Sequence, residues 1–315
     1  MTVYSKPAAK VTDVPFAMYD AFTDVPYSGS QAAVVLQASG ISAPHRVRIA
    51  REIGAPATSF VDAVADNRVV VQFFSTVMEL PMCGHGTVCL VTRLVEQGLL
   101  AAAGDTWQEA TLDLPKGAAR VEYRQTPTGR IEVMLDVAPA QFTAPALDFD
   151  ALARILGVDV ADFSTDLPPE VATADFIHLC LPMRDLAAMR ALSPDFTALA
   201  EFCVSNGLET VAAFSTQVED TSCSLHVRDF CPAVGVAESA AAGTTNAALA
   251  AYLLHNACVR PGANGVTVVR AEQGIELRRP SNVTTRITAN KGTITQLQVG
   301  GVASRVIEGT LNVSL

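Results

Sequence analysis

The stretch Glu79-Leu-Pro-Met-Cys-Gly-His-Gly-Thr87 stands directly before a mostly apolar run at residues 88–95. Small residues followed by helical spacing of apolar residues predict that a strand turns into a helix here. The first turn of a helix leaves several backbone N–H groups unpaired and carries about half a positive charge. A carboxylate can bind at such an end. The stretch therefore predicts both a fold element and a place for a ligand.

Cys83 is the reactive side chain of this stretch. A thiol at a helix N-terminus can have its pKa lowered from about 8.5 to between about 3.5 and 7.5, because the same field favours the thiolate. The chain has seven cysteines and no CxxC pair, and free cysteines are most often small buried apolar residues. For the other six we expect burial without chemistry. Gly84 and Gly86 allow close approach to Cys83, so we expect Cys83 to be functional.

Composition excludes several classes of protein. The chain has 315 residues, 50% hydrophobic and 17% charged, which predicts a folded chain with a sizeable core. The net charge of −10 argues against a nucleic acid or an anionic membrane surface as partner. We expect no transmembrane helix, because no uncharged apolar run reaches about 18 residues. The absence of a secretory signal pattern, with an odd number of scattered cysteines, predicts a cytoplasmic protein.

Short β-branched or apolar segments bounded by Gly, Pro or Asp predict strands. They lie at residues 16–19, 32–36, 69–74, 110–114, 130–135, 176–181, 210–215, 222–227, 265–270 and 274–278. Helical spacing predicts helices at residues 44–53, 87–97, 149–156, 195–206 and 245–257. Many strands with few helices, without strict alternation, predict an α+β fold.

The chain is expected to consist of two pseudo-equivalent halves. A Pro-containing linker at about residues 137–145 separates an N-terminal half, residues 1–138, from a C-terminal half, residues 146–300. We expect a C-terminal strand at 302–315 to complete the first half. The second half repeats the design of the first, since Glu238-Ser-Ala-Ala-Ala-Gly-Thr-Thr-Asn246 also leads into a helical run.

Both turns place a Gly followed by a Thr at the helix start, at Gly86-Thr87 and at Gly243-Thr244. If the halves face each other, two helix N-termini point into one cleft. Such a cleft suits removal of a proton next to a carboxylate, because fixed N–H donors stabilise the developing enolate. The residues expected to bind substrate are Gly84, Gly86, Thr87, Ser239, Gly243, Thr244 and Thr245.

Motifs along nearly the whole chain resemble those of the PhzF-like phenazine-biosynthesis isomerases, relatives of diaminopimelate epimerase and proline racemase. The motifs are Asp20-Ala-Phe-Thr-Asp-Val-Pro-Tyr-Ser-Gly29, Ile49-Ala-Arg-Glu-Ile53, Thr58-Ser-Phe-Val61, Phe74-Ser-Thr-Val-Met-Glu-Leu-Pro-Met-Cys-Gly-His85, Phe230-Cys-Pro-Ala-Val-Gly-Val-Ala-Glu238, and Gln273-Gly274 with Arg279-Pro-Ser281. The resemblance implies a diaminopimelate epimerase-like fold, each half a sheet around a central helix, with the site between the halves. It also implies a homodimer, and proton-shift chemistry without metal or organic cofactor.

The chain departs from this pattern at several positions. The catalytic glutamate of the family falls on Ala57, and its acidic residue after Glu238 falls on Ser239. The Asn-Pro of the opening motif is Ser30-Gln31. The sequence around Cys83 is closer to the proline racemase pattern, but the second thiol of that pattern falls on Ala242. The carboxylate base of these isomerases is thus absent by residue type, and a symmetrical two-thiol racemase is also disfavoured.

The remaining hypothesis is a site with one thiol base, Cys83, and His85 beside it. His85 is equally suited to proton transfer and to a structural hydrogen bond, and Glu79 is expected to hold the turn. The predicted function is a cofactor-independent isomerase or epimerase of a small amino acid or unsaturated acid. One alternative is a dehydratase that uses the same thiol, and another is a non-catalytic protein that binds small carboxylates.

Overall fold

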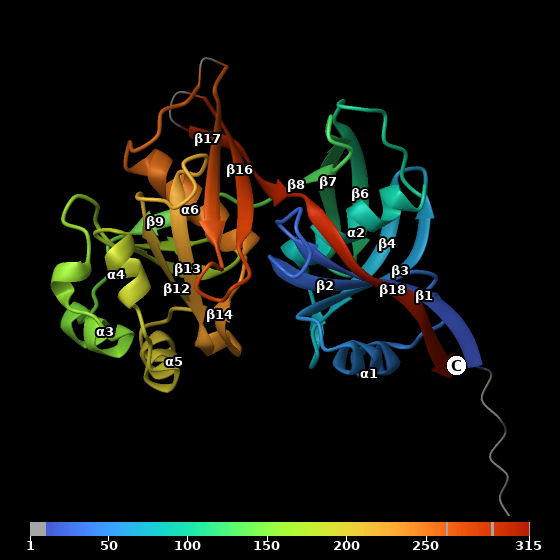
Figure 1. Cartoon of the computed structure of the whole chain (residues 1–315), viewed down its shortest axis with the longest axis horizontal. Helices are drawn as coiled ribbons and strands as arrows, with labels where there is room; N and C mark the ends of the chain where they lie inside the picture. The colour runs from blue at the N-terminus through green and yellow to red at the C-terminus, as the bar shows by residue number, and fades with distance from the viewer. Residues whose placement is uncertain (1–10, 263, 291–292, 315) are drawn as a thin grey trace, which may run out of the picture.

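A computed structural model describes residues 11–262, 264–290 and 293–314. Two halves lie side by side (Figure 1), and together they form an α+β fold dominated by sheet. The N-terminal half contains β1 (Val11–Ala21), β2 (Ser30–Val35), α1 (Ala43–Ile53), β3 (Ala57–Ala65), β4 (Arg68–Phe74), β5 (Glu79–Leu80), α2 (Gly84–Glu96), β6 (Gln108–Leu114), β7 (Gly117–Gln125), β8 (Ile131–Asp136) and β18 (Ala303–Ser314). Within these described residues no helix is both long and apolar enough to cross a membrane.

The C-terminal half follows from β9 onward. It contains β9 (Gln141–Thr143), α3 (Phe149–Leu156), β10 (Glu170–Thr173), β11 (Ile177–Pro182), α4 (Leu186–Ala191), α5 (Phe196–Ser205), β12 (Thr210–Ser215), β13 (Leu225–Cys231), β14 (Val236–Ser239), α6 (Gly243–His255), β15 (Val266–Gln273), β16 (Ser281–Asn290) and β17 (Thr293–Gly301). β17 pairs with β8, so the sheet continues from one half into the other. β18 then returns along β1 at the far side of the N-terminal half (Figure 1).

The two halves repeat one pattern of strand pairing. In the N-terminal half β2 and β3 are parallel, β3 and β4 antiparallel, and β4 and β6 parallel across α2. In the C-terminal half β11 and β12 are parallel, β12 and β13 antiparallel, and β13 and β15 parallel across α6. Each parallel pair needs a crossover, which a helix provides. The predicted α+β fold with two similar halves is confirmed.

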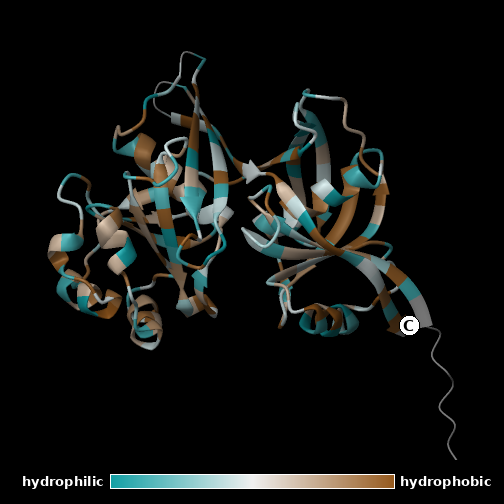
Figure 2. Cartoon of the chain, viewed as in Figure 1, coloured by the Kyte–Doolittle hydropathy of each residue, from teal (hydrophilic) through white to brown (hydrophobic). Residues whose placement is uncertain are grey.

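The central helices α2 and α6 form the middle of each half. All residues from Gly86 to Leu94 in α2 are buried, as are nearly all residues of α6 up to Leu253. A helix that is buried on all sides lies inside a core. The outer helices behave differently: α1 alternates hydrophilic and hydrophobic residues along its length (Figure 2) and covers one face of the N-terminal sheet. Helices α3, α4 and α5 cover the outer face of the C-terminal sheet.

Most predicted elements match the structure, with two corrections. The strand predicted at 274–278 is wrong, because Gly274 and Arg278 have positive φ and Arg279 N donates to Gly274 O, which makes this segment a turn between β15 and β16. The predicted linker at 137–145 contains the short strand β9, which pairs with β10.

The cysteines are all free. Five of the six outside the first turn of α2 are buried, as expected, but Cys258 is exposed.

Candidate functional site

The start of α2 is built around Cys83. Cys83 is the N-cap, and its Sγ accepts a hydrogen bond from Gly86 N at 3.4 Å. Thr87 Oγ1 donates to Cys83 O at 2.8 Å, so this hydroxyl is engaged within the turn. A Cβ on Gly86 would lie 3.1 Å from both Cys83 Sγ and the Phe73 ring. Glycine at position 86 therefore allows the thiol and the phenyl ring to pack against the helix.

His85 lies beside the thiol. Its Nδ1 is 3.4 Å from Cys83 Sγ, and the ring is half-buried. Burial lowers the pKa of His85 to about 4, so the imidazole is neutral at neutral pH. Gly84, one residue before it, is also half-buried, and its backbone follows the capping residue directly. The predicted pair of Cys83 and His85 is thus in contact.

The protonation state of Cys83 differs from the sequence prediction. Its side chain is buried, and burial raises the pKa of the thiol to about 12, although hydrogen bonds from the Gly86 and His85 backbones favour the thiolate. Loss of hydration outweighs the helix terminus here. The prediction of a depressed thiol pKa is wrong, since a thiol with this raised pKa is protonated at neutral pH.

The start of α6 differs from that of α2. Its N-cap is Ala242, and no side chain caps the helix. Gly243 is buried and Thr244 half-buried. Thr245 is buried and donates its Oγ1 hydrogen bond to Asp229 Oδ2 at 3.0 Å, so only the backbone of Thr245 remains for a ligand. The first N–H groups of α6 have no side-chain partner at the cap, and donors of this kind can bind an anion.

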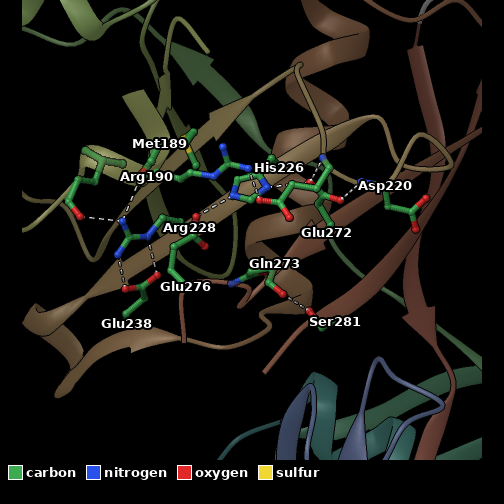
Figure 3. A network of polar contacts seen from close by, with 12 residues as sticks. Met189, Arg190, Asp220, His226, Arg228, Glu238, Glu272, Gln273, Glu276 and Ser281 are labelled. Atoms are coloured by element: carbon green, nitrogen blue, oxygen red, sulfur yellow. Dashed lines mark hydrogen bonds and ion pairs between the residues drawn. The ribbon is translucent and has the colours of Figure 1, made fainter. Parts of the chain in front are cut away.

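The turn before α6 is held from the closing motif. Gln273 Oε1 accepts hydrogen bonds from Ala242 N at 3.3 Å and Asn246 Nδ2 at 2.7 Å, while its Nε2 donates to Ser239 O at 2.9 Å. Ser281 Oγ donates to Gln273 O at 3.1 Å (Figure 3). Ser239 is thus fixed through its backbone, and its half-buried side chain lies at the end of β14.

The opening and closing motifs meet across the halves. Arg279 donates from Nη2 to Asp20 Oδ1 at 2.6 Å and from Nε to Gly29 O at 2.8 Å. Asp20 is 1% exposed, and its other oxygen accepts from Tyr27 N at 2.7 Å. These contacts, which we call the clasp, bind the first turn of the N-terminal half to the β15–β16 turn of the C-terminal half.

The two helix starts are linked through the seam between β8 and β17. A Cβ on Gly243 would lie 3.3 Å from Val299 of β17, and Val299 pairs with Leu135 of β8. Residues of α2 and α6 approach within 8 Å between Cα atoms. One apolar cluster includes Cys83 at the start of α2 and Ala247 in the second turn of α6. Both central helices therefore contribute to one packed apolar region across the seam.

The structure shows the contacts of Ala57 and Glu79, two positions discussed in the sequence analysis. Ala57 is fully buried in the cluster that contains Cys83, and Ser59, on the same side of β3, donates to Gly86 O at 3.5 Å. Position 57 therefore faces α2 with a methyl group. Glu79 Oε1 accepts from Gln72 Nε2 at 3.1 Å. The hydrogen-bond partner of Glu79 is therefore a side chain on β4. The prediction that Glu79 holds the turn by accepting from backbone N–H groups does not describe this contact.

Sequence reasoning missed Asp229. It is 2% exposed on β13, and it is the cross-strand partner of Ser239. Burial raises the pKa of Asp229 to about 6, while the hydrogen bond from Thr245 and the nearby Thr210 hydroxyl lower it. Thr210 Oγ1 also lies 2.7 Å from Nδ1 of the buried His178. The predicted strand ended at residue 227; extension by one alternation would have placed Asp229 on the same face as Val227.

No group of three or more His, Cys, Asp or Glu side chains in the described part of the chain is arranged to hold a metal ion.

Comparison with known proteins finds a match to one protein family. A family model described as phenazine biosynthesis-like protein matches residues 19–309. The chain is 28% identical over 288 residues to an uncharacterized isomerase, YddE, of Escherichia coli O157:H7, covering 90% of this chain and 93% of that protein. It is 26% identical over 297 residues to the trans-2,3-dihydro-3-hydroxyanthranilate isomerase of Pseudomonas chlororaphis, covering 94% and 98%.

Solved structures show the same fold. A phenazine biosynthesis protein of the PhzF family from Bacillus anthracis superposes with a TM-score of 0.86 and 25% identity, covering 96% of this chain and all of that one. A probable proline racemase from Agrobacterium radiobacter superposes with a TM-score of 0.59 at 12% identity, covering 96% and 93%, which is a likeness of fold alone.

Proposed function

The chain belongs to the family of phenazine biosynthesis-like proteins, and we propose that it is a cofactor-independent isomerase or epimerase of a small amino acid or unsaturated acid. The reaction moves a proton at the carbon next to the substrate carboxylate. The observation that carries the proposal is the pairing of a buried thiol at one helix start with an uncapped helix start in the other half. The isomerase names of the relatives support the reaction class.

The uncapped start of α6 suits the substrate carboxylate. Ala242 offers no side-chain oxygen or sulfur to the first N–H groups, and Gly243 lets a ligand come close to the backbone. Fixed N–H donors near a helix terminus also stabilise the enolate that forms when the α-proton leaves. In the first turn of α2 the Gly86 N–H group is already engaged, since Cys83 Sγ accepts from it. The proposal therefore assigns anion binding to α6.

Cys83 carries a proton to or from the substrate carbon. Because burial keeps the thiol protonated, Cys83 enters the reaction as the acid that delivers a proton to the enolate carbon. In the reverse direction the same thiolate removes that proton, as microscopic reversibility requires. His85, neutral and 3.4 Å away, orients the S–H group.

Exchange of the substrate α-proton with solvent tests the proposal. The wild-type protein is incubated in deuterated water with a panel of amino acids and of butenoic acids, and deuterium at carbon is read by NMR. Cys83→Ser should lower net isomerisation at least about 100-fold, since a positioned proton-transfer group contributes that much. Cys258→Ser is the matched control, because Cys258 is an exposed thiol outside the site. Full activity of Cys83→Ser would refute the thiol mechanism.

Product analysis separates the alternatives. Loss of water, with a keto acid or imine as product, would replace the isomerase by the dehydratase. Tight binding of a carboxylate by wild type and Cys83→Ser alike, without deuterium exchange in either protein, would favour the non-catalytic binding protein.

A further inference from the structure

Asp229 occupies the polar end of an otherwise apolar sheet face. On β13, Leu225 and Val227 belong to the apolar cluster around α6, and Asp229 follows them on the same side. Thr245, in the first turn of α6, donates a 3.0 Å hydrogen bond to Asp229 Oδ2. The carboxyl group therefore lies beside the start of α6, the end to which we assign the substrate carboxylate.

The second oxygen of this carboxyl has no partner. Asp229 is 2% exposed, and among the described residues nothing hydrogen-bonds to its Oδ1. A buried carboxyl oxygen without a partner is unfavourable, because it has lost its hydration, so natural proteins rarely keep one without a use. A buried, under-satisfied acid next to a ligand-binding end is a candidate for proton transfer.

The surroundings of Asp229 set its titration. Burial raises its pKa to about 6, and the Glu238 charge on β14 adds to this, while Thr245 on α6 and Thr210 on β12 lower it. Two further titratable groups lie close by: Cys231 on its own strand, whose pKa is raised by burial, and the buried His178 on β11, which contacts Thr210 and whose pKa is lowered to about 4. The carboxyl is thus mostly ionised at pH 7.5 and close enough to neutrality to accept and return a proton.

The N-terminal half has a different residue at the matching place. β4 pairs with β5 through Phe73–Leu80 and Phe74–Glu79. β13 pairs with β14 through Asp229–Ser239 and Phe230–Glu238 in the same way. Phe73, the counterpart of Asp229, packs against the start of α2 where the thiol stands. Each helix start therefore has one group able to carry a proton: a thiol on the turn of α2, and a carboxyl beside α6.

We propose that Asp229 is the second catalytic residue, the base that works against Cys83; this rests on the proposed function. Asp229 Oδ1 takes the α-proton, the electrons of the C–H bond remain on the substrate as an enolate, and the carboxyl becomes neutral. Cys83 S–H then protonates the carbon and becomes a thiolate. Exchange with water returns the proton of Asp229 to solvent and restores the thiol, so that charge and protons balance over one turnover.

Three variants test the assignment on the deuterium-exchange panel. Asp229→Asn keeps the size of the side chain and its bond to Thr245, and should lower exchange at least about 100-fold. Thr245→Val keeps the carboxyl but removes a hydrogen bond that stabilises its charge, so the acid limb of the pH–rate profile should move to higher pH. A merely structural role of Asp229 would not move that limb. Asp229→Asn combined with Ser239→Asp returns a carboxyl one strand away and should recover part of the exchange.

A measurement without turnover gives the second readout. Difference infrared spectra of wild type and Asp229→Asn between pH 5 and pH 8 isolate the titration of this carboxyl. We expect a midpoint near 6 that rises when crotonate, a planar small carboxylate, is added, because a bound anion disfavours a second negative charge. A midpoint that excess crotonate leaves unchanged would overturn the assignment.

The outcomes separate the two proposals. Full exchange by Asp229→Asn, together with loss of net isomerisation in Cys83→Ser, would overturn the role of Asp229 and leave the isomerase in place. Full exchange by Asp229→Asn and full isomerisation by Cys83→Ser would refute both. A Thr245→Val profile that coincides with that of wild type, in a protein that melts normally, would also count against Asp229.

Discussion

The starts of α2 and α6 occupy equivalent places in the two halves, yet their chemistry differs. At α2 a thiol caps the helix, and the phenyl ring of Phe73 on the neighbouring strand packs against the helix start. At α6 the cap is a methyl group, and the matching strand position carries Asp229. One scaffold thus carries a thiol at the first helix start, and at the second a helix without a side-chain cap beside a buried carboxyl group. In a repeated fold the position of the helix starts is the same in both halves, whereas the side chains at these positions can differ.

The largest expected effect comes from opening the clasp. Arg279→Met keeps the length of the side chain but leaves Asp20, which is 1% exposed, as a buried carboxylate without its cation. Removal of one partner of such a pair costs about 3–5 kcal/mol. Urea unfolding should show this loss, whereas Arg68→Met, which opens the exposed pair with Asp113 on the N-terminal sheet, should cost less than about 1 kcal/mol. Equal losses for the two variants would mean that the clasp does not hold the halves together.

The clasp also shows where sequence reasoning stops. Local signals were enough for α1, α2, α3, α5 and α6, because caps, glycines and helical spacing act within a few residues. Asp20 and Arg279 were quoted only as parts of separate motifs, since no local pattern pairs residues 259 positions apart.

The site was predicted in part for the same reason. The position of Cys83 at a helix start follows from neighbouring residues. Its protonation state depends on burial by strands from elsewhere in the chain, and that outweighed the helix terminus. Asp229 was not predicted as a site residue because the strand was predicted to end at residue 227. Asp229 lies two residues further on and contacts Thr245 of α6.

A smaller effect should distinguish the two helix starts by packing. Gly86→Ala would place a Cβ 3.1 Å from Cys83 Sγ and from the Phe73 ring, both buried, and should cost about 1–3 kcal/mol. In Gly243→Ala the nearest neighbour of the new Cβ is a methyl group of Val299 at 3.3 Å, while its second methyl group and the Phe22 ring lie at ordinary contact distances of 3.7 and 3.9 Å, so the change should cost less than about 1 kcal/mol. Thermal or urea unfolding measures both. If Gly243→Ala were the costlier change, the packing contrast between the two starts would be wrong.

His226 in the C-terminal half and His85 in the N-terminal half should respond to pH in opposite directions. His226 lies between Glu272 (2.7 Å) and Glu276 (3.0 Å), as Figure 3 shows. Burial alone would lower the pKa of His226, but hydrogen bonds and charge from the two carboxylates raise it above 6.5. Its stabilising contribution is therefore complete below the unfolded pKa of about 6.5 and is lost as pH rises through the higher folded value. Burial lowers the pKa of His85 to about 4, so protonation of His85 opposes folding below about pH 6.5.

Unfolding free energies of wild type, His226→Gln and His85→Gln at several pH values between 5 and 9 check this contrast. We expect His226→Gln to lose the decline in stability above pH 6.5. His85→Gln should instead reduce the decline toward pH 5. Parallel pH profiles for all three proteins would contradict the assignment of opposite shifts.

The pH dependence of alkylation at Cys83 tests most directly the central claim that this thiol is a neutral, buried acid. Iodoacetamide labelling of wild type is followed by mass spectrometry from pH 6 to pH 10, with the exposed Cys258 as internal reference. Only the thiolate reacts. Because burial raises the pKa of Cys83 to about 12, its labelling should stay slower than that of Cys258 and keep rising with pH over the whole range. A rate at Cys83 that exceeds that of Cys258 at pH 7 and levels off below pH 8 would show a thiolate near neutrality, and the account of Cys83 as the acid of the site would be wrong.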